Sequence, residues 1–348
     1  MKSTKYLNRD FEEALKNVQN QSFDKEDIKR LLSIQEDEEK KKILETASKV
    51  REKFFSNKVF LYGFVYFSTV CRNNCNFCYY RKTNELPNRY RKDKKEIFEI
   101  SKSLIEEGVN LIDITSGQDP YYEKNFGELL NIIEELSTLN RPIMVSPGVK
   151  NKDQIQKIHE KGADWYAIYQ ETHDLNLYKE LRPNQSFKAR KRVRKEAREA
   201  GLLAEDGLLY NLGEDTDSLA RTIYQMSQED VAQVRCMEYV RHDGVPLPEV
   251  KKRDPKLIIA LLRLTNPRKL VPASLDIRGL DGISEKIRAG ANVVTSIIPP
   301  DFSLSGVANH EYGIEDGERS PSQVKSYLEE NGFRAARTQE LVDYINGF

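Results

Sequence analysis

The chain has 348 residues, 39% hydrophobic and 32% charged, which suits two average domains or one large α/β barrel. Its 55 basic residues balance 55 acidic ones, which argues against a nucleic-acid-binding protein that relies on a basic face. No apolar run reaches the roughly 18 residues that span a membrane, and we find no export signal, so we expect a cytoplasmic protein.

The N-terminal part of the chain is polar and helical in pattern. The stretches 11–18, 25–33 and 36–54 each have the spacing of a helix. We expect residues 1–55 to form a helical extension that packs outside a main domain. No low-complexity segment or credible linker follows, so residues 56–348 are predicted to be one domain.

From residue 59 onward, apolar strand-like runs alternate with amphipathic helical stretches. We expect strands at 59–69, 111–116, 143–146, 165–169, 208–212, 231–240, 270–277 and 292–298. The helices between them include 96–107, 126–136, 154–161 and 187–200, and a last helix and a short end segment follow from residue 321. Eight strand–helix units predict an α/β fold of the (β/α)8 TIM-barrel type, with an open doubly wound sheet as the alternative.

A cluster of cysteines directly follows the first predicted strand. Cys71, Cys75 and Cys78 have the spacing C-x3-C-x2-C. Three thiolates on one loop can hold three irons of a [4Fe-4S] cluster, which usually takes four cysteines. The fourth iron then keeps an open coordination position, as catalytic metal sites do. Because catalytic groups of such barrels gather at the C-terminal ends of strands, the position of this loop supports both the cluster and the fold.

A zinc site or a disulfide framework fits these cysteines less well. Zinc needs a fourth Cys or His at motif spacing, and the nearest downstream histidine is the distant His159. Disulfide frameworks are typical of short secreted chains. The remaining cysteine, Cys236, stands alone in an apolar run and is predicted to be a buried structural thiol.

Several predicted strands carry polar residues where a structural strand would be apolar: Asp113, Arg235, Ser274 and Asp276. A charge inside a barrel is costly unless it is paired. One interpretation is internal pairing, such as Asp113 with Arg235. The other is a charged ligand, because one guanidinium and two carboxylates complement an amino acid, and best a diamino acid.

The end of the fourth strand and the helices after it carry a second polar group. Gln170 and Glu171 close the strand, and Arg182 and Arg190 follow. Glutamate and arginine here could hold the amino-acid end of a second ligand. As helix residues, the two arginines could instead belong to a solvated face.

Two loops complete the candidate site. Ser116, Gly117 and Gln118 follow the second strand, and the glycine would let the backbone approach a ligand closely, although an ordinary turn is the alternative. The basic stretch 81–95 is interpreted as a mobile lid or a surface loop rather than an RNA-binding segment.

The cysteine loop resembles that of the radical S-adenosylmethionine (SAM) enzymes. In that family the open iron chelates SAM, and an electron from the cluster cleaves it to a 5′-deoxyadenosyl radical that abstracts hydrogen from the substrate. The resemblance implies that Cys71, Cys75 and Cys78 are cluster ligands and that Phe77 lies beside the adenine. The segment S-G-Q-D-P stands where the family has a G-G-E-like contact to SAM, so Ser116, Gly117 and Gln118 depart from the pattern.

A closer resemblance covers nearly the whole chain. The segments YFSTVCRNNCNFCYY, GQDPYY, YQET, VPASLDI and NVVTSIIPP look like those of the lysine mutases of pyrrolysine biosynthesis, which are similar to biotin synthase and to a hydrogenase maturase. This implies a radical isomerase that converts L-lysine to (3R)-3-methyl-D-ornithine by hydrogen abstraction and carbon-skeleton rearrangement. It also implies that Glu171 and Arg190 bind SAM, and that lysine is held by Asp113, Arg235, Ser274 and Asp276.

The resemblance also limits the alternatives and names partners. Sulfur insertion of the biotin synthase type needs an auxiliary cluster, for which only Cys236 is left. A hydrogenase-type maturase that acts on another small amino-acid-like ligand is the alternative function. We expect an oxygen-sensitive enzyme that works anaerobically as a monomer, with an electron donor such as ferredoxin or flavodoxin.

Overall fold

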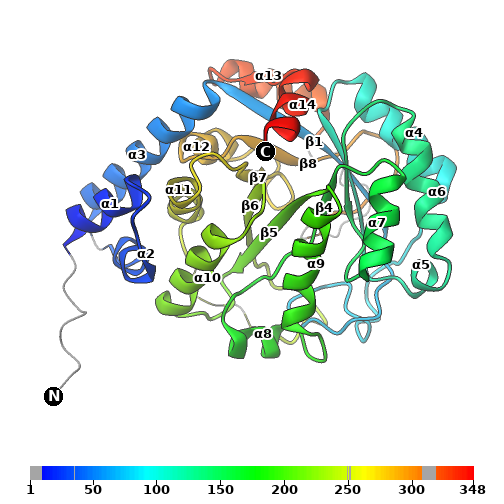
Figure 1. Ribbon diagram of the computed structural model, residues 1–348, viewed down its shortest axis with the longest axis horizontal. Coiled ribbons are helices and arrows are strands. Elements are labelled where there is room, and N and C mark those ends of the chain that lie inside the picture. Colours follow the sequence, from blue (N-terminus) through cyan, green and yellow to red (C-terminus); the bar gives the residue numbers. More distant parts are fainter. Residues whose placement is uncertain (1–9, 35, 249, 251, 308–318) are drawn as a thin grey trace.

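Eight parallel strands form a barrel inside a layer of helices (Figure 1). The computed structural model describes residues 10–34, 36–248, 250, 252–307 and 319–348. The barrel strands are β1 (Lys58–Ser68), β2 (Leu111–Ser116), β3 (Ile143–Ser146), β4 (Trp165–Ala167), β5 (Leu203–Tyr210), β6 (Gln233–Glu238), β7 (Pro272–Ser274) and β8 (Val293–Ile297).

The strand order shows that the sheet curls back on itself. Neighbouring strands run β6-β5-β4-β3-β2-β1-β8-β7, and each pair is parallel. A parallel bridge between Gln233 and Leu270 brings β6 to the start of β7, and Val234 N donates to Leu270 O at 3.0 Å. The predicted (β/α)8 barrel is therefore confirmed, and the open doubly wound alternative is wrong.

Helices follow the strands and cover the outside of the barrel (Figure 1). They are α4 (Lys94–Glu106), α5 (Pro120–Lys124), α6 (Phe126–Ser137), α7 (Lys152–Glu160), α8 (Leu175–Leu181), α9 (Phe187–Glu199), α10 (Thr216–Gln228), α11 (Pro255–Thr265), α12 (Ile283–Arg288) and α13 (Pro321–Glu330). No helix in these described parts of the chain is long and apolar enough to cross a membrane.

Strands β4, β6 and β7 are shorter than the predicted 165–169, 231–240 and 270–277, and two further elements differ more from the sequence prediction. Strand β5 begins at Leu203, earlier than the expected residue 208. The prediction missed its first half because that half contains Glu205 and Asp206 and lacks an apolar pattern. The end segment after α13 forms the short strand β9 (Arg334–Ala335), which pairs with β1, and a further helix, α14 (Thr338–Gly347).

The amino end of the barrel is closed by apolar packing. Phe60, Leu111, Trp165 and Leu203, at or near the starts of their strands, share one hydrophobic cluster with Leu341 of α14. Burying these side chains stabilises the fold and fills this end of the barrel with apolar groups. The opposite end, where the strands finish, carries the polar residues described below.

The N-terminal helices lie beside the barrel (Figure 1). Helix α2 (Lys25–Leu32) packs against α10, α3 (Asp37–Phe55) packs against α11, and α1 (Phe11–Gln19) packs against α2. Their buried apolar faces belong to the same hydrophobic cluster that lies between the strands and the outer helices. At the surface, Lys25 Nζ pairs with Asp217 of α10 at 2.7 Å.

Candidate active site at the carboxyl end of the barrel

The cysteine loop begins three residues after β1 and is braced by two neighbouring segments. Arg72 N donates to Gln118 O at 3.0 Å, which ties the loop to the segment after β2. Asn76 N donates to Leu181 O at 2.8 Å, which ties it to the end of α8. The loop is therefore fixed on the functional end of the barrel, as the sequence predicted.

The three cysteines of this loop share one partly buried site. All are free thiols. Burial raises the pKa of the Cys71 and Cys78 thiols, and the nearby Cys75 raises both further. For Cys71 and Cys78 to become thiolates they need a positively charged partner, as the iron of an iron–sulfur cluster provides. This donor set fits the [4Fe-4S] cluster of the radical SAM family.

Gly117 packs against this loop. A Cβ at Gly117 would stand 2.4 Å from the carbonyl oxygen of Val70 and 2.9 Å from Cys71 Cβ, so only glycine fits. Next to it, the Gln118 amide accepts from Asn73 Nδ2 at 3.0 Å and donates to Glu123 at 2.8 Å. Gly117 and Gln118 thus support the cysteine loop directly, whereas Ser116 pairs with Ser68 of β1.

A buried ion pair stands beside the cysteine loop. Arg182 Nη2 donates to Glu171 Oε1 at 2.5 Å, and the Arg182 guanidinium lies 5.1 Å from the centre of the Phe77 ring. Cys75 Sγ accepts from Arg182 at 3.4 Å and from Gln185 at 3.1 Å. Although burial opposes it, the Cys75 and Glu171 charges raise the pKa of Arg182.

The two arginines after β4 are buried, so the interpretation as a solvated helix face is wrong for them. Arg182 is 8% exposed and Arg190 is 7% exposed. Arg190 Nε donates to Tyr169 O at 2.6 Å, and burial together with Arg182 lowers the pKa of Arg190 to about 10. Gln170 points outward instead, where it bonds to Phe187 O and Arg194 of α9.

A cavity of about 190 Å³ opens at the carboxyl ends of the strands. It brings together residues from the cysteine loop and from the ends of β2, β4, β6 and β7. Seven of the predicted site residues line it: Phe77, Cys78, Asp113, Glu171, Arg235, Ser274 and Asp276. A mostly apolar cavity with a few convergent charged groups is the usual form of a small-molecule site.

The charged groups on the substrate side of this cavity are paired differently from the sequence interpretation. Arg235 pairs with Glu205 (Nε to Oε1, 2.5 Å), and its guanidinium lies 5.2 Å from the centre of the Tyr169 ring. The proposed internal pairing of Arg235 with Asp113 is therefore replaced by one with Glu205. Burial raises the pKa of Asp113 to about 7, with Arg235 opposing and Glu205 reinforcing this shift.

Ser274 and Asp276 lie at the end of β7. The Ser274 hydroxyl is 3.0 Å from Ser296 Oγ and accepts from the Asp276 backbone N at 3.1 Å. Arg319 Nη2 donates to Asp276 Oδ1 at 3.2 Å. The carboxylate of Asp276 is thus held at the cavity wall by a buried arginine that the sequence interpretation did not include.

Cys236 and Lys286 are two titratable residues of the cavity lining that were not predicted as site residues. Cys236 is half-buried: it packs against the hydrophobic core, as a structural thiol would, but it also lines the cavity, so its interpretation as a buried structural thiol is only partly correct. Burial raises its pKa to about 12, so it stays a neutral thiol near pH 7. Lys286 of α12 also lines the cavity, and burial lowers its pKa. An isolated lysine on a short helix gives no motif by which it could be found from the sequence.

Comparison with known proteins agrees with this site. A family model of the Radical SAM superfamily matches residues 65–223. The 3-methylornithine synthase of Methanosarcina acetivorans is 43% identical over 322 residues, which cover 91% of each chain. The [FeFe] hydrogenase maturase subunit HydE of Thermotoga maritima is 29% identical over 288 residues, which cover 81% of this chain and 82% of that one.

The solved structures include one that matches over almost its full length. The crystal structure of methylornithine synthase (PylB) has a TM-score of 0.89 and 38% identity, covering 95% of this chain and 99% of that one. The cysteine loop, the barrel and the polar cavity are thus found in a chain that resembles these proteins from end to end. The chain is a radical SAM enzyme and belongs to the 3-methylornithine synthase family, whose members use a [4Fe-4S] cluster and SAM.

Proposed function

We propose that this enzyme is an intramolecular mutase that converts L-lysine to (3R)-3-methyl-D-ornithine for pyrrolysine biosynthesis. The observation that carries the proposal is the composition of one cavity. Cys78, Phe77 and Glu171 line it on the cluster side, and Asp113 and Arg235 line it on the other. The cavity therefore offers an arginine and aspartates to a diamino acid beside the place where the cofactor binds.

We assign the cofactor side as follows. Cys71, Cys75 and Cys78 hold the cluster, and Phe77 lies beside the adenine of SAM. When bound, the reduced cluster and SAM supply a 5′-deoxyadenosyl radical that abstracts a hydrogen atom from the substrate. The other residues that we assign to SAM are Ser116, Gly117, Gln118, Glu171, Arg182 and Arg190. Gln170 is left out, because its side chain bonds to Phe187 O and Arg194 of α9 on the outer side of the barrel. Of these, Glu171 and Arg182 have the strongest support, because they form a buried pair against Phe77.

We assign the substrate side by charge. Arg235 binds the α-carboxylate through Nη1, because Glu205 already occupies Nε and Nη2. Asp113 and Asp276 bind the two ammonium groups. Ser274 adds a polar hydroxyl to the cavity wall beside Asp276. Holding the substrate in a water-poor cavity orients the reacting carbon and keeps the fragments together during rearrangement.

The setting of the enzyme is part of the proposal. We propose a monomer in the reducing cytoplasm, with residues 1–55 as a helical extension and residues 56–348 as the catalytic barrel. A ferredoxin or flavodoxin supplies the electron. A reducing compartment keeps the three loop thiols available for iron.

The proposal is tested by anaerobic incubation with SAM, a reductant and L-lysine, followed by chromatographic separation of amino acids of equal mass. A branched isomer of lysine is the expected product. Formation of 5′-deoxyadenosine without any isomer would contradict the proposal and favour a maturase acting on another small amino-acid-like ligand. Cys75→Ser is the matched control, because it removes one cluster ligand and should produce neither compound.

A further inference from the structure

Strand β5 carries two acidic residues in succession, and both are fully buried. Glu205 and Asp206 each have 0% exposure. Consecutive side chains of a strand point to opposite faces of the sheet. Glu205 accordingly faces the barrel interior, where it meets Arg235, and Asp206 faces outward, where it meets Arg194 of α9. Neither carboxylate belongs to the lining of the cavity.

The Glu205 carboxylate fixes the guanidinium of Arg235. Its Oε1 accepts from Arg235 Nε at 2.5 Å, and its Oε2 accepts from Arg235 Nη2 at 3.4 Å. The hydroxyl of Tyr169 also donates to Oε2 at 3.2 Å, while the Tyr169 ring lies below the guanidinium. A bidentate contact of this kind sets both the position and the plane of an arginine.

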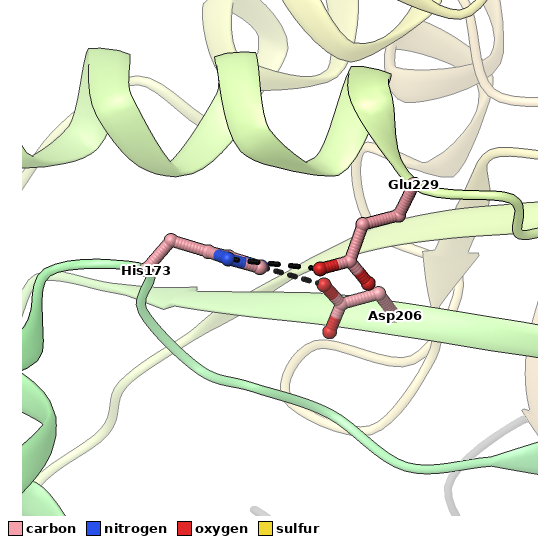
Figure 2. Close-up of side chains that lie close together, drawn as sticks. All are labelled: His173, Asp206 and Glu229. Carbon is pink, nitrogen blue, oxygen red and sulfur yellow. Dashed lines mark hydrogen bonds and ion pairs between the residues drawn. The ribbon is translucent and has the colours of Figure 1, made fainter. Parts of the chain in front are cut away.

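The Asp206 carboxylate is the centre of a second network, on the other face of β5. Figure 2 shows the carboxylates of Asp206 and Glu229, which come from different elements, both facing the ring of His173. His173 Nε2 is 2.7 Å from Asp206 Oδ2, and the backbone N–H of Gln170 donates to Oδ1 at 2.8 Å. Burial alone would raise its pKa, but Arg194 and His173 hold the pKa of Asp206 below its usual range.

This trio has the residue types of a metal site, but a protein cation already occupies it. Ligand atoms of His173, Asp206 and Glu229 lie within 4.8 Å of one another. Arg194 sits between the two carboxylates, 3.3 Å from Asp206 and 2.6 Å from Glu229. The guanidinium therefore supplies the positive charge that a metal ion would bring, and the network has a structural task.

The structural task of this network is to hold Glu171, which lies between Gln170 and His173, two residues that are bonded to Asp206. Glu171 has φ of +67°, a left-handed conformation that is strained for a non-glycine residue and persists only where the surroundings enforce it. On one side of it, the Gln170 backbone is held by Asp206, and two residues on the other side His173 is held by the same carboxylate. Glu171 itself pairs with β5, donating its N–H to Gly207 O at 2.9 Å.

We propose that Glu205 and Asp206 are positioning residues with separate targets: Glu205 orients Arg235 toward the substrate, and Asp206 holds the strained turn that presents Glu171 to SAM. One strand thereby aligns the two ligands of the reaction from its two faces. The part of the proposal that concerns Glu205 rests on the proposed function, because it needs Arg235 to bind lysine. The part that concerns Asp206 involves only the binding of SAM.

The test compares Glu205→Gln with Asp206→Ala in the anaerobically reconstituted enzyme. We expect Glu205→Gln to raise the KM for lysine about tenfold or more while the Kd of SAM stays unchanged. We expect Asp206→Ala to raise the Kd of SAM about tenfold or more, while the KM for lysine at saturating SAM stays unchanged. The SAM-induced change in the electron paramagnetic resonance spectrum of the reduced cluster reports SAM binding without turnover, and iron content is measured for each variant.

Conservative variants guard against a failure to fold. Glu205→Asp keeps the charge but shortens the side chain, and Asp206→Asn keeps an acceptor for the Gln170 N–H, so each should give a smaller shift in the same direction. If either residue only stabilised the barrel, its variant would change both constants and the iron content together, and this result would overturn the proposal. Unchanged constants in the folded variants would overturn it as well.

The two proposals fail in different ways. If the wild-type enzyme leaves lysine unchanged, the proposed function is wrong, and so is the inference that Glu205 orients Arg235 toward lysine. The inference about Asp206 is then still decided by the Kd of SAM. If the wild type isomerises lysine but the variants bind both ligands normally, the positioning inference alone is wrong.

Discussion

Lysine binding should depend on pH through Asp113. This carboxyl is 2% exposed, and its neighbours are Arg235, Glu205 and the Thr115 hydroxyl, which donates to it at 3.0 Å. Burial raises its pKa to about 7, so near neutral pH the free enzyme is a mixture of the acid and the carboxylate. Only the carboxylate can pair with a substrate ammonium, so lowering the pH should remove the binding form.

The size of the effect follows from that pKa. At pH 6, about one tenth of the free enzyme carries an ionised Asp113, and the fraction falls about tenfold with each further pH unit. We therefore expect kcat/KM for lysine to rise about tenfold per unit up to pH 7 and then to level off, because kcat/KM follows the ionisation of the free enzyme. A bound ammonium lowers the pKa of the carboxyl, so kcat should change much less.

The assay is the initial rate of isomer formation between about pH 5.5 and about pH 8.5, at saturating SAM and without oxygen. Asp113→Asn should raise the KM and abolish its rise at low pH, since the amide does not titrate. Asp217→Asn is the matched control, because Asp217 pairs with Lys25 on the outside of α10 and should leave the profile unchanged. A flat profile in the wild type, or an unaltered one in Asp113→Asn, would refute the reasoning.

Three further substitutions test other parts of the site. Gly117→Ala puts a Cβ 2.4 Å from the Val70 carbonyl oxygen, so we expect a loss of about 1–3 kcal/mol of stability and a lower iron content. Thermal unfolding and an iron assay measure these two effects. Normal iron loading would contradict the packing argument. Arg182→Gln leaves the buried Glu171 without its cation, so the Kd of SAM should rise about tenfold or more, and an unchanged Kd would remove Arg182 from the SAM site. Arg235→Ala should abolish turnover with the cluster intact by iron assay, and full activity would discard its assignment to the substrate carboxylate.

Much of this fold can be predicted from the sequence, because buried parallel strands are short apolar runs bounded by helices. The predictions for 111–116 and 143–146 coincide with β2 and β3. The start of strand β5 was predicted five residues too late, since Glu205 and Asp206 break its apolar run. The strand start and the two positioning residues were missed for the same reason: charged residues in a strand look like a loop until their partners are known.

The predicted site residues were found by motif and by polar residues in strands, whereas their partners were not. Cys71, Asp113 and Arg235 stand out in the sequence because each lies in or directly after an apolar run. The ion pairs of Arg235 with Glu205 and of Arg319 with Asp276 join elements that are 30 and 43 residues apart. Which charges meet across a barrel depends on strand order and register, and these emerge only from the folded chain.

The central claim is that three protein thiolates hold a cluster whose fourth iron is left for SAM. The most direct measurement is anaerobic reconstitution followed by iron and sulfide counting and electron paramagnetic resonance of the reduced protein with and without SAM. We predict four irons per chain, a spectrum that changes when SAM is added, and loss of the cluster in Cys71→Ser. Bound zinc, or a four-iron cluster whose spectrum ignores SAM because the protein ligates every iron, would contradict the account.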